Sequence, residues 1–252
     1  MKDFSGKVAL VTGTTGIGRA VAKRFAEDRA SVMACGIEQA GNEELAKEAA
    51  ARGLTLRVER CDISKLDDVR SVVQKAVSAF GGLDIIVNAA GIHPFGTVLE
   101  TDFDTWNQCM LVNVASIYLL AKSGIPEMKK RGGGSIINIA SVQGYACQRG
   151  VAAYATSKGA VHSLTRALAL DHSSDKIRVN SISPGSIAAH FGQGLPLEQV
   201  LERFAEAHPL RRNGTPEEVA ELAAFLASDR AGFCTGGDYL IDGGLLAGIG
   251  VQ

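Results

Sequence analysis

The strongest constraint on this chain is the alternation of short apolar runs with longer segments whose apolar residues recur at helical spacing. The first apolar run is Val8–Val11, and a glycine-rich turn follows it directly. Six similar runs follow at Ser31–Cys35, Leu54–Val58, Leu83–Val87, Ser135–Ile139, Ile177–Ile182 and Tyr239–Ile241. Strands that alternate with helices favour a parallel sheet with right-handed crossovers, and nearly continuous apolar strands favour a sheet covered on both faces. We therefore predict an α/β fold, a doubly wound parallel sheet of seven strands with helices on both faces, which binds its ligand at the carboxyl ends of the strands.

The length and composition are those of one soluble globular unit. The 252 residues contain no linker rich in Ser, Pro or Gly, so we predict a single domain over residues 1–252. A net charge of −1 gives no reason to expect nucleic acid or an acidic membrane as a partner, and no apolar run reaches the ~18 residues that a membrane span needs. The five scattered cysteines form no CxxC pair. They indicate reduced thiols, and we predict a cytoplasmic protein without a metal site.

The turn after the first run has the composition of a phosphate-binding loop. It reads Thr12-Gly13-Thr14-Thr15-Gly16-Ile17-Gly18, and a helical pattern follows over Arg19–Asp28. A helix N-terminus presents free N–H groups and a partial positive charge, and glycines let a phosphate approach the backbone closely. A lone glycine turn is also compatible with a purely structural role. Its position at the first strand-to-helix junction favours a dinucleotide site.

A Tyr–Lys pair provides candidate acid–base chemistry. Tyr154 and Lys158 lie four residues apart in the helical pattern Val151–Asp171, which puts both side chains on one helix face. A cation about 4 Å from the phenol, worth about 4 kcal/mol at an effective dielectric constant near 20, lowers the pKa of the phenol by roughly three units. Such a shift brings the tyrosine toward the pH range of efficient acid–base catalysis. On its own the pair is more typical of an ordinary amphipathic helix.

Two further polar residues, Ser141 and Asn113, are compatible with either a catalytic or a structural role. Ser141 follows the run Ser135–Ile139, at the edge where such sheets bind ligands, and its hydroxyl suits either a substrate oxygen or a helix cap. Asn113 interrupts an apolar helical stretch and needs hydrogen-bond partners if it is buried. Those partners belong either to the fold or to a water in a proton path.

Taken together, these residues resemble the short-chain dehydrogenase/reductase superfamily, in its single-domain branch of about 250 residues with one Rossmann domain. The matching positions run through nearly the whole chain: Gly13, Gly16 and Gly18, Asp62, Asn88-Ala89-Ala90-Gly91, Asn113, Ser141, Tyr154 with Lys158, Pro184-Gly185 and Asp242-Gly243-Gly244. The combination is specific to the family, whereas no single motif is.

The resemblance implies an NAD(P)-dependent oxidoreductase that moves a hydride between the nicotinamide and the carbon of a secondary alcohol or ketone. Tyr154 would be the general acid or base, Lys158 would lower its pKa and bind the nicotinamide ribose, and Ser141 would orient the substrate oxygen. Asn113 would hold a water in a proton relay. The resemblance also implies a homo-oligomer, a dimer or tetramer.

The implied cofactor-binding residues include the glycine turn, the residues after three further strands, and the catalytic pair. They are Gly13, Thr14, Thr15, Gly16, Ile17, Gly18, Asp62, Ile63, Asn88, Ala89, Ala90, Gly91, Tyr154, Lys158, Pro184, Gly185 and Ile187.

The chain departs from the family pattern at three places. Only Thr14 and Thr15 separate the first two glycines, so the loop is one residue short and the phosphate geometry must differ. Gly36 occupies the position where NAD-binding members carry an acid for the ribose hydroxyls. The segment after Pro184-Gly185 lacks the usual Thr, so Ser186 or a backbone group must hold the nicotinamide amide. We favour NAD over NADP because the corresponding positions also lack a cation for a 2′-phosphate.

The expected substrate pocket is rich in hydrogen-bonding side chains, which favours a polar substrate such as a sugar or polyol. We predict substrate contacts from His93, Gln143, Gln148 and His190, with a lid around residues 186–212. A lone loop histidine is also typical of a solvated residue. Two other functions stay open. One is a 3-oxoacyl-thioester reductase that uses NADPH, for which Arg203, Arg211 and Arg212 would bind the carrier, and the other is a non-catalytic dinucleotide-binding regulator.

Overall fold

The predicted parallel sheet is confirmed in a computed structural model that describes residues 4–188, 202 and 204–248. Seven strands of the described chain form one sheet in the order β3-β2-β1-β4-β5-β6-β7, and every pairing is parallel. The strands are β1 (Val8–Thr12), β2 (Ser31–Gly36), β3 (Leu56–Arg60), β4 (Ile85–Asn88), β5 (Gly134–Ile139), β6 (Ile177–Pro184) and β7 (Asp238–Ile241). Each lies within two residues of a predicted run at both ends.

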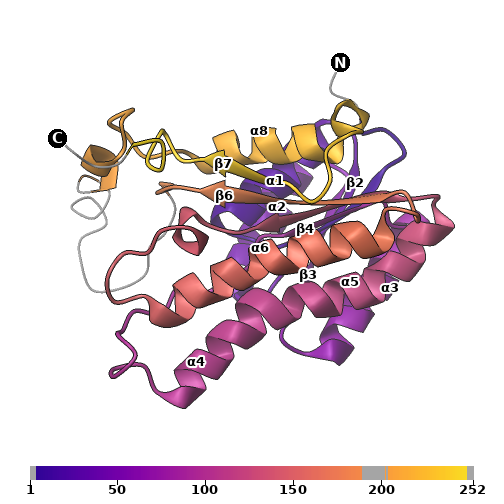
Figure 1. Ribbon diagram of the computed structural model, residues 1–252. Coiled ribbons are helices and arrows are strands. Elements are labelled where there is room, and N and C mark those ends of the chain that lie inside the picture. The colour runs from indigo at the N-terminus through magenta and orange to yellow at the C-terminus, as the bar shows by residue number, and fades with distance from the viewer. Residues whose placement is uncertain (1–3, 189–201, 203, 249–252) are drawn as a thin grey trace.

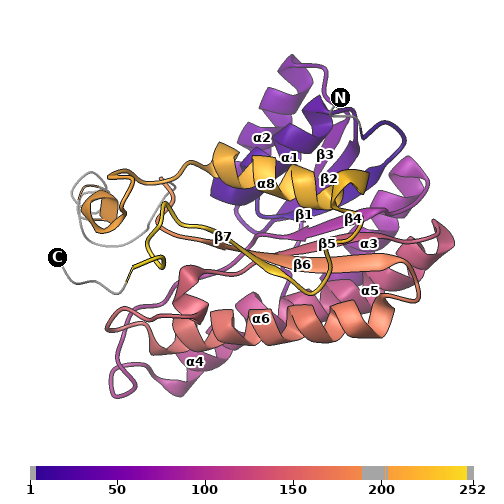
Figure 2. The same cartoon turned by 45° about the horizontal axis from the view of Figure 1, so that its top comes forward.

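Helices cover both faces of the sheet, as Figures 1 and 2 show. One face carries α1 (Gly16–Glu27), α2 (Gln39–Ala51) and α8 (Pro216–Ala227). The other carries α3 (Leu66–Phe80), α4 (Phe103–Met110), α5 (Ser116–Lys130) and α6 (Ala152–His172). Two short 3₁₀ turns, η2 (Val142–Gly144) and η3 (Asp229–Ala231), complete the described elements together with the π-turn η1 (Leu111–Ala115). The expected helix over 151–171 is therefore α6, shifted by one residue.

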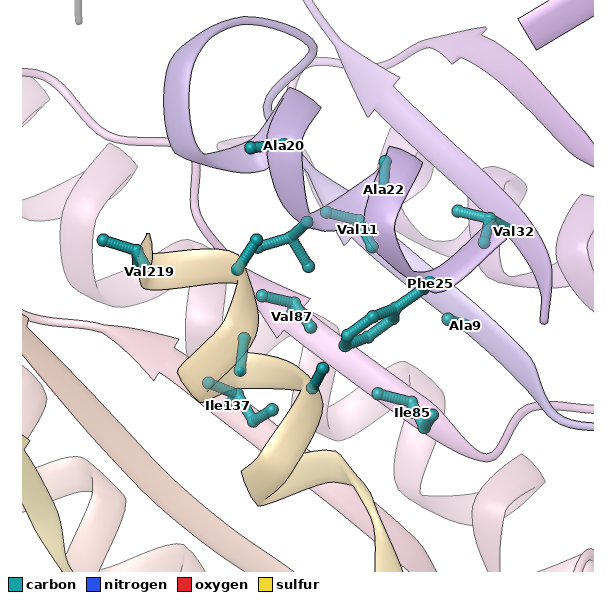
Figure 3. Packing of buried hydrophobic residues seen from close by; sticks show 14 of the residues in the cluster. Ala9, Val11, Ala20, Ala22, Phe25, Val32, Ile85, Val87, Ile137 and Val219 are labelled. Atoms are coloured by element: carbon teal, nitrogen blue, oxygen red, sulfur yellow. The ribbon is translucent and has the colours of Figure 1, made fainter. Parts of the chain in front are cut away.

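Each face of the sheet buries its own apolar cluster. Beneath α1 and α8, the fully buried Phe25 of α1 lies close to residues of β1 and β4, including Ala9 and Ile85 (Figure 3). A second cluster fills the space between the sheet and α3, α5 and α6. The central strands are buried along their whole length, whereas the edge strands β3 and β7 are only partly buried because each has one neighbouring strand.

The long helical pattern from Phe103 to Arg131 contains a feature that periodicity did not predict. The backbone continues from α4 into α5 through the π-turn η1, which carries Asn113. By length and composition the stretch Phe103–Lys130 is apolar enough to cross a membrane, but 44% of its most apolar window is buried inside the fold. One such helix is weak evidence for a membrane span, because core helices of globular proteins pass the same test.

The strand order places the candidate site. The chain runs from β1 outward to β3, then returns to add β4 on the other side of β1. Helices on opposite faces diverge at this reversal, and the crevice outside the carboxyl ends of β1 and β4 is where doubly wound sheets bind ligands. The glycine turn follows β1, Ala89-Ala90-Gly91 follows β4, Ser141 comes shortly after β5, and Gly185 follows β6.

Candidate active site

The glycine turn joins β1 to helix α1 despite its missing residue. Gly13 and Gly16 have positive φ angles of 91° and 49°, which side chains rarely tolerate. A Cβ on Gly18 would overlap the carbonyl oxygen of Gly13, so a glycine is needed for the helix to begin this close to the strand. The Thr15 side chain makes no capping hydrogen bond within the described chain. The N–H groups at the start of α1 are therefore available to an anion, as a pyrophosphate requires.

The short loop and Gly36 are coupled through Thr14. A Cβ built on Gly36 would lie 2.6 Å from the Thr14 hydroxyl and 3.0 Å from Oδ1 of Asn42. Thr14 and Asn42 are both buried, and the Asn42 amide donates to the Gly36 carbonyl at 3.0 Å. The volume beside the end of β2 is thus filled by a residue of the loop. An acidic side chain has no room at position 36 in this conformation.

Asp62 and Ile63 lie at the end of β3, but the Asp62 carboxylate is already engaged. Its Oδ1 accepts hydrogen bonds from the Ser64 hydroxyl at 2.6 Å and the Ser64 N–H at 3.1 Å. These bonds, chiefly that of the hydroxyl, hold the pKa of Asp62 below its usual value. Asp62 therefore orders the turn that follows β3, and its Oδ2, 3.3 Å from Lys65 Nζ, is the oxygen placed for a further contact.

Asn88, expected among the cofactor-binding residues, has its amide nitrogen engaged within the fold, while its buried Oδ1 has no partner in the described chain. Its amide donates to Oδ1 of Asn138 on β5 at 2.7 Å, and the Asn138 amide continues to the Thr165 hydroxyl on α6 at 2.9 Å. This buried polar chain ties the sheet to α6. The residue that shapes the β4 end toward the crevice is Thr12, whose hydroxyl accepts the N–H groups of Ala89 and Ala90 at 3.0 and 3.1 Å. Its place at the end of a strand was the only signal for it in the sequence.

Ser141, Tyr154 and Lys158 meet at the crevice. Ser141 lies beside the Tyr154 phenol, close enough to affect its pKa, and Ser141 Oγ accepts the Gln143 N–H at 3.1 Å. Lys158 is buried one turn along α6, where its Nζ donates to the Ile139 carbonyl at 2.7 Å and lies 5.5 Å from the centre of the Tyr154 ring. Ser141, which follows β5, therefore lies next to Tyr154 and Lys158 of α6.

Asn113 is fully engaged in the fold. Its Oδ1 accepts the Ile92 N–H at 2.8 Å, and its amide donates to the Ile92 carbonyl and to Ser157 Oγ at 2.9 Å each. π-turns are often found at functional sites, and this one turns Asn113 toward α6 and the segment after β4. A Cβ on Gly91 would lie 3.1 Å from the Asn113 oxygen and 3.8 Å from Lys158 Nζ. Asn113 thus holds the segment after β4 against the helix that carries Tyr154 and Lys158.

The electrostatics of the Tyr–Lys pair differ from the prediction. Burial raises the pKa of Tyr154 to about 12, although the neighbouring Ser141 side chain partly opposes the shift. Burial also lowers the pKa of Lys158 to about 8. The prediction that Lys158 lowers the pKa of Tyr154 is therefore wrong for this structure, because removal from water is the largest influence on the phenol and the ammonium is turned to the Ile139 carbonyl. At neutral pH the phenol keeps its proton and acts as a donor.

Two of the four predicted substrate residues lie at the reacting groups. The His93 ring packs on Tyr154 with centroids 3.9 Å apart, and burial lowers the pKa of His93 so that the ring is neutral at pH 7. Gln143 is the residue whose N–H binds Ser141. His93 Nδ1 and Gln143 Oε1 are buried without a hydrogen-bond partner among the described residues. Gln148 is half-buried between the Ser141 turn and α6, and His190 lies outside the described residues.

His208 fixes the loop that follows Pro184. Its Nδ1–H donates to the Phe204 carbonyl at 2.6 Å, and its Nε2 accepts the Ser186 N–H at 3.1 Å. A Cβ on Gly185 would lie 2.6 Å from the same nitrogen, which explains the glycine. Ser186 Oγ is buried and has no partner in the described chain. It fits the carboxamide of a nicotinamide, while Ile187 is packed in a β-bridge with Gly214.

The comparisons with known proteins agree with this geometry. A family model described as enoyl-(acyl carrier protein) reductase matches residues 11–246. The chain is 39% identical to a 3β-hydroxysteroid dehydrogenase of Eggerthella lenta, which covers 96% of this chain and 95% of that one. It is 36% identical to a meso-2,3-butanediol dehydrogenase of Serratia marcescens, covering 98% and 97%. A solved short-chain type dehydrogenase/reductase from Mycobacterium marinum superposes with a TM-score of 0.90 at 35% identity, covering 98% of both chains.

The chain belongs to the short-chain dehydrogenase/reductase family. It is an oxidoreductase that acts on CH–OH groups, and NAD(P) dependence is expected for the family. The residues fit such a cofactor at two points, the uncapped start of α1 and the unpartnered Ser186 hydroxyl. The regulator hypothesis loses its support, because the relatives named here are dehydrogenases and the catalytic set of this dehydrogenase is assembled.

The coupling of Thr14 to Gly36 predicts a conditional effect of an acid at position 36. We expect Gly36→Asp to lower the free energy of unfolding by about 1–3 kcal/mol, because the new Cβ crowds two buried polar atoms. Thr14→Ala combined with Gly36→Asp removes the nearest of those atoms and regains part of the loss. Urea denaturation of the wild type, both single variants and the double variant measures the coupling. Additive effects of the two substitutions would contradict it.

The depressed pKa of Lys158 predicts a stability change at alkaline pH. Lys158 titrates near 8 in the folded chain and near its ordinary 10.5 when unfolded, so the unfolded state binds more protons between these values. The contribution of Lys158 to the free energy of unfolding therefore rises with pH from about 8 to 10.5, and it is lost as the pH falls through 8. We expect the wild type to gain unfolding free energy relative to Lys158→Met as the pH rises from 7.5 to 10. Parallel pH curves for the two proteins would show that Lys158 has an ordinary pKa.

Proposed function

We propose that this dehydrogenase transfers a hydride between NAD and the carbinol carbon of a hydroxylated substrate such as a sugar or polyol. The observation that carries the proposal is the contact of Tyr154 with Ser141, beside two buried polar atoms that lack partners in the described chain. The Tyr154 and Ser141 hydroxyls suit the reacting oxygen of the substrate. The two unpartnered atoms, Gln143 Oε1 and His93 Nδ1, suit a second substrate hydroxyl.

The roles of the residues follow from their contacts. The nicotinamide, when bound, supplies or accepts the hydride. Ser141 Oγ and the Tyr154 phenol hold the substrate oxygen, and the phenol donates its proton to that oxygen in the reducing direction. Lys158 stands near the start of the segment after β4, where its ammonium would bind a ribose hydroxyl of the cofactor. Asn113 holds the segment after β4 against α6. A relay water would contact its side chain or the Ile92 carbonyl.

A polar substrate is favoured by the cost of leaving buried polar atoms without hydrogen bonds. An unpaired buried donor or acceptor costs about 1–3 kcal/mol, so a substrate hydroxyl that pairs with Gln143 Oε1 gains affinity over a substrate without one. Two relatives support the proposal that the substrate has a second hydroxyl, because they are dehydrogenases named for diols. The diols are meso-2,3-butanediol and 2,5-dichloro-2,5-cyclohexadiene-1,4-diol. The Sphingobium indicum enzyme named for the second diol is 40% identical over 98% of both chains.

The preference for NAD rests on the surroundings of Gly36. Ile37 is exposed where a basic residue would meet a 2′-phosphate, and Glu38 at the start of α2 would repel it. Arg19 is paired with Glu44 and Glu48 at 2.8 Å each. If NADPH binds more tightly than NADH, Arg60 is the cation to test, because it is exposed and in register with Gly36 on the neighbouring strand.

The alternative of a 3-oxoacyl-thioester reductase finds little support. Arg212 donates to both carboxylate oxygens of Glu218 at 2.6 and 2.8 Å, and Arg211 donates to the Glu206 carbonyl at 3.1 Å. These guanidinium groups are occupied by the fold and are not arranged for a phosphopantetheine carrier. Arg203 lies outside the described residues.

We further propose a cytoplasmic homo-oligomer. The described cysteines are free thiols, which fits a reducing compartment. Phe103, Leu111 and Tyr118 are exposed along the outer side of the α4–α5 helix, and Leu170 of α6 is 80% exposed. Exposed apolar side chains gathered on helices of one face favour packing against a second copy.

Replacement of Tyr154 tests the proposed chemistry. We expect Tyr154→Phe to lower kcat at least 1,000-fold with the best alcohol from a screen of sugars, polyols, meso-2,3-butanediol and a 3β-hydroxysteroid, because the proton donor is lost. Its affinity for NADH, followed by nicotinamide fluorescence, should stay within about threefold of wild type. A parallel NADPH titration measures the cofactor preference. Substantial turnover by Tyr154→Phe would overturn the mechanism.

A charge on the exposed apolar side of the α4–α5 helix tests the assembly. We expect the wild type to elute as a dimer or tetramer and Leu111→Glu to reduce its mass, because a buried unpaired carboxylate is costly. Size-exclusion chromatography with light scattering reports the masses. The matched control Leu99→Glu, at a 98% exposed position outside this helix, should keep the wild-type mass. A monomeric wild type would refute the proposal.

A further inference from the structure

A buried carboxylate on β7 collects three hydroxyl donors. Asp238 Oδ1 accepts hydrogen bonds from Ser181 at 2.5 Å and Ser183 at 2.9 Å, both on β6. Its Oδ2 accepts the Tyr145 hydroxyl at 2.9 Å. The Asp238 side chain is only 8% exposed. None of these residues belongs to the catalytic or cofactor-binding set, so the cluster has a different role.

His162 connects the cluster to the catalytic helix. It lies one turn beyond Lys158 and two turns beyond Tyr154 on α6, and its Nε2 is 2.9 Å from Ser183 Oγ. Because Ser183 donates its hydroxyl proton to Asp238, the His162 Nε2–H is the donor in this contact. Burial lowers the pKa of His162, although the Asp238 carboxylate, 3.5 Å from Nε2, opposes the shift.

Tyr145 connects the same cluster to the Ser141 turn. Its ring packs on His162 with centroids 4.5 Å apart, and its N–H donates to the Val142 carbonyl at 2.9 Å. The Gly144 N–H donates to the Ser141 carbonyl, and a Cβ on Gly144 would overlap the His162 ring. The 3₁₀ turn that begins at Ser141 is thereby held directly over His162.

We propose that Asp238 is a positioning residue that sets the Ser141 turn against Tyr154 and Lys158. One carboxylate is bonded to the turn through Tyr145, to α6 through Ser183 and His162, and to β6, the strand that leads into Pro184-Gly185. A displacement of about 1 Å between Ser141 and Tyr154 is enough to cost a large factor in rate. The inference rests on the proposed roles of Ser141 and Tyr154 and names the group that keeps them in place.

Asp238→Asn and Tyr145→Phe test this role. Tyr145→Phe removes the hydroxyl that donates to Asp238, and Asp238→Asn leaves one acceptor oxygen where the carboxylate has two, both with little change in size. With NAD⁺ and meso-2,3-butanediol as the probe alcohol, we expect each to lower kcat at least tenfold and raise KM, while the Kd for NADH stays within about threefold. The double variant should be close to Asp238→Asn, because the bond that Tyr145→Phe removes is one of the three that Asp238→Asn disturbs. The matched control is Tyr239→Phe, on the same strand and packed on the cluster beneath α1 and α8, which should keep wild-type kcat and KM.

The possible outcomes separate this inference from the proposed function. A purely structural cluster would lower the melting temperature and the folded fraction without changing kcat or KM per folded molecule, and that result would refute the positioning role. If Asp238→Asn does not fold, Tyr145→Phe decides alone, because that ring lies at the surface and keeps its packing on His162. If Tyr154→Phe turns over the probe as well as wild type does, the proposed chemistry is at fault. If only Tyr154→Phe is impaired, the chemistry stands and the role of Asp238 fails.

Discussion

The site depends on the burial of one cation, Lys158, among neutral groups. Its ammonium is held by a carbonyl oxygen at the end of β5, and the cost of removing it from water appears in its lowered pKa. Such a group stays in place only where the surrounding backbone is firmly held. Asn113 anchors the segment after β4 against α6, and the chain of Asn88, Asn138 and Thr165 anchors the sheet to the same helix. The polar side chains inside this fold therefore serve to hold α6 against the carboxyl ends of β4 and β5.

Much of the fold was predictable because its determinants are local. Seven apolar runs give the strand positions to within two residues, the helical spacing between them indicates the helices, and the glycine turn marks the strand from which the sheet is wound in both directions. The catalytic set was predictable for a different reason. Ser141, Tyr154 and Lys158 are close in sequence, and the parallel topology brings their elements together at one edge.

What could not be predicted depends on distances between residues far apart in the sequence. The direction of the Asn88 side chain is decided by a partner fifty positions away, and the π-turn at Asn113 leaves no trace in hydrophobic periodicity. The pKa of Tyr154 was mispredicted because spacing on a helix gives the proximity of Lys158 but not the depth of burial, which shifts both pKa values against ionisation. Nothing in the sequence connects Asp238 with His162, and they meet only because β7 pairs with β6.

The three departures from the family pattern are better understood in space than in sequence. The short glycine loop and the missing acid at position 36 look independent, yet Thr14 of the loop occupies the volume that a side chain at position 36 would need. With Thr14 in this position, a side chain at position 36 would clash with its hydroxyl. The third departure is local, since the Ser186 hydroxyl has no partner among the described residues, in the loop that His208 fixes. The adenosine end of the site has thus been rebuilt around a neutral threonine, while the groups at the reacting end keep the arrangement that hydride transfer to or from a secondary alcohol requires.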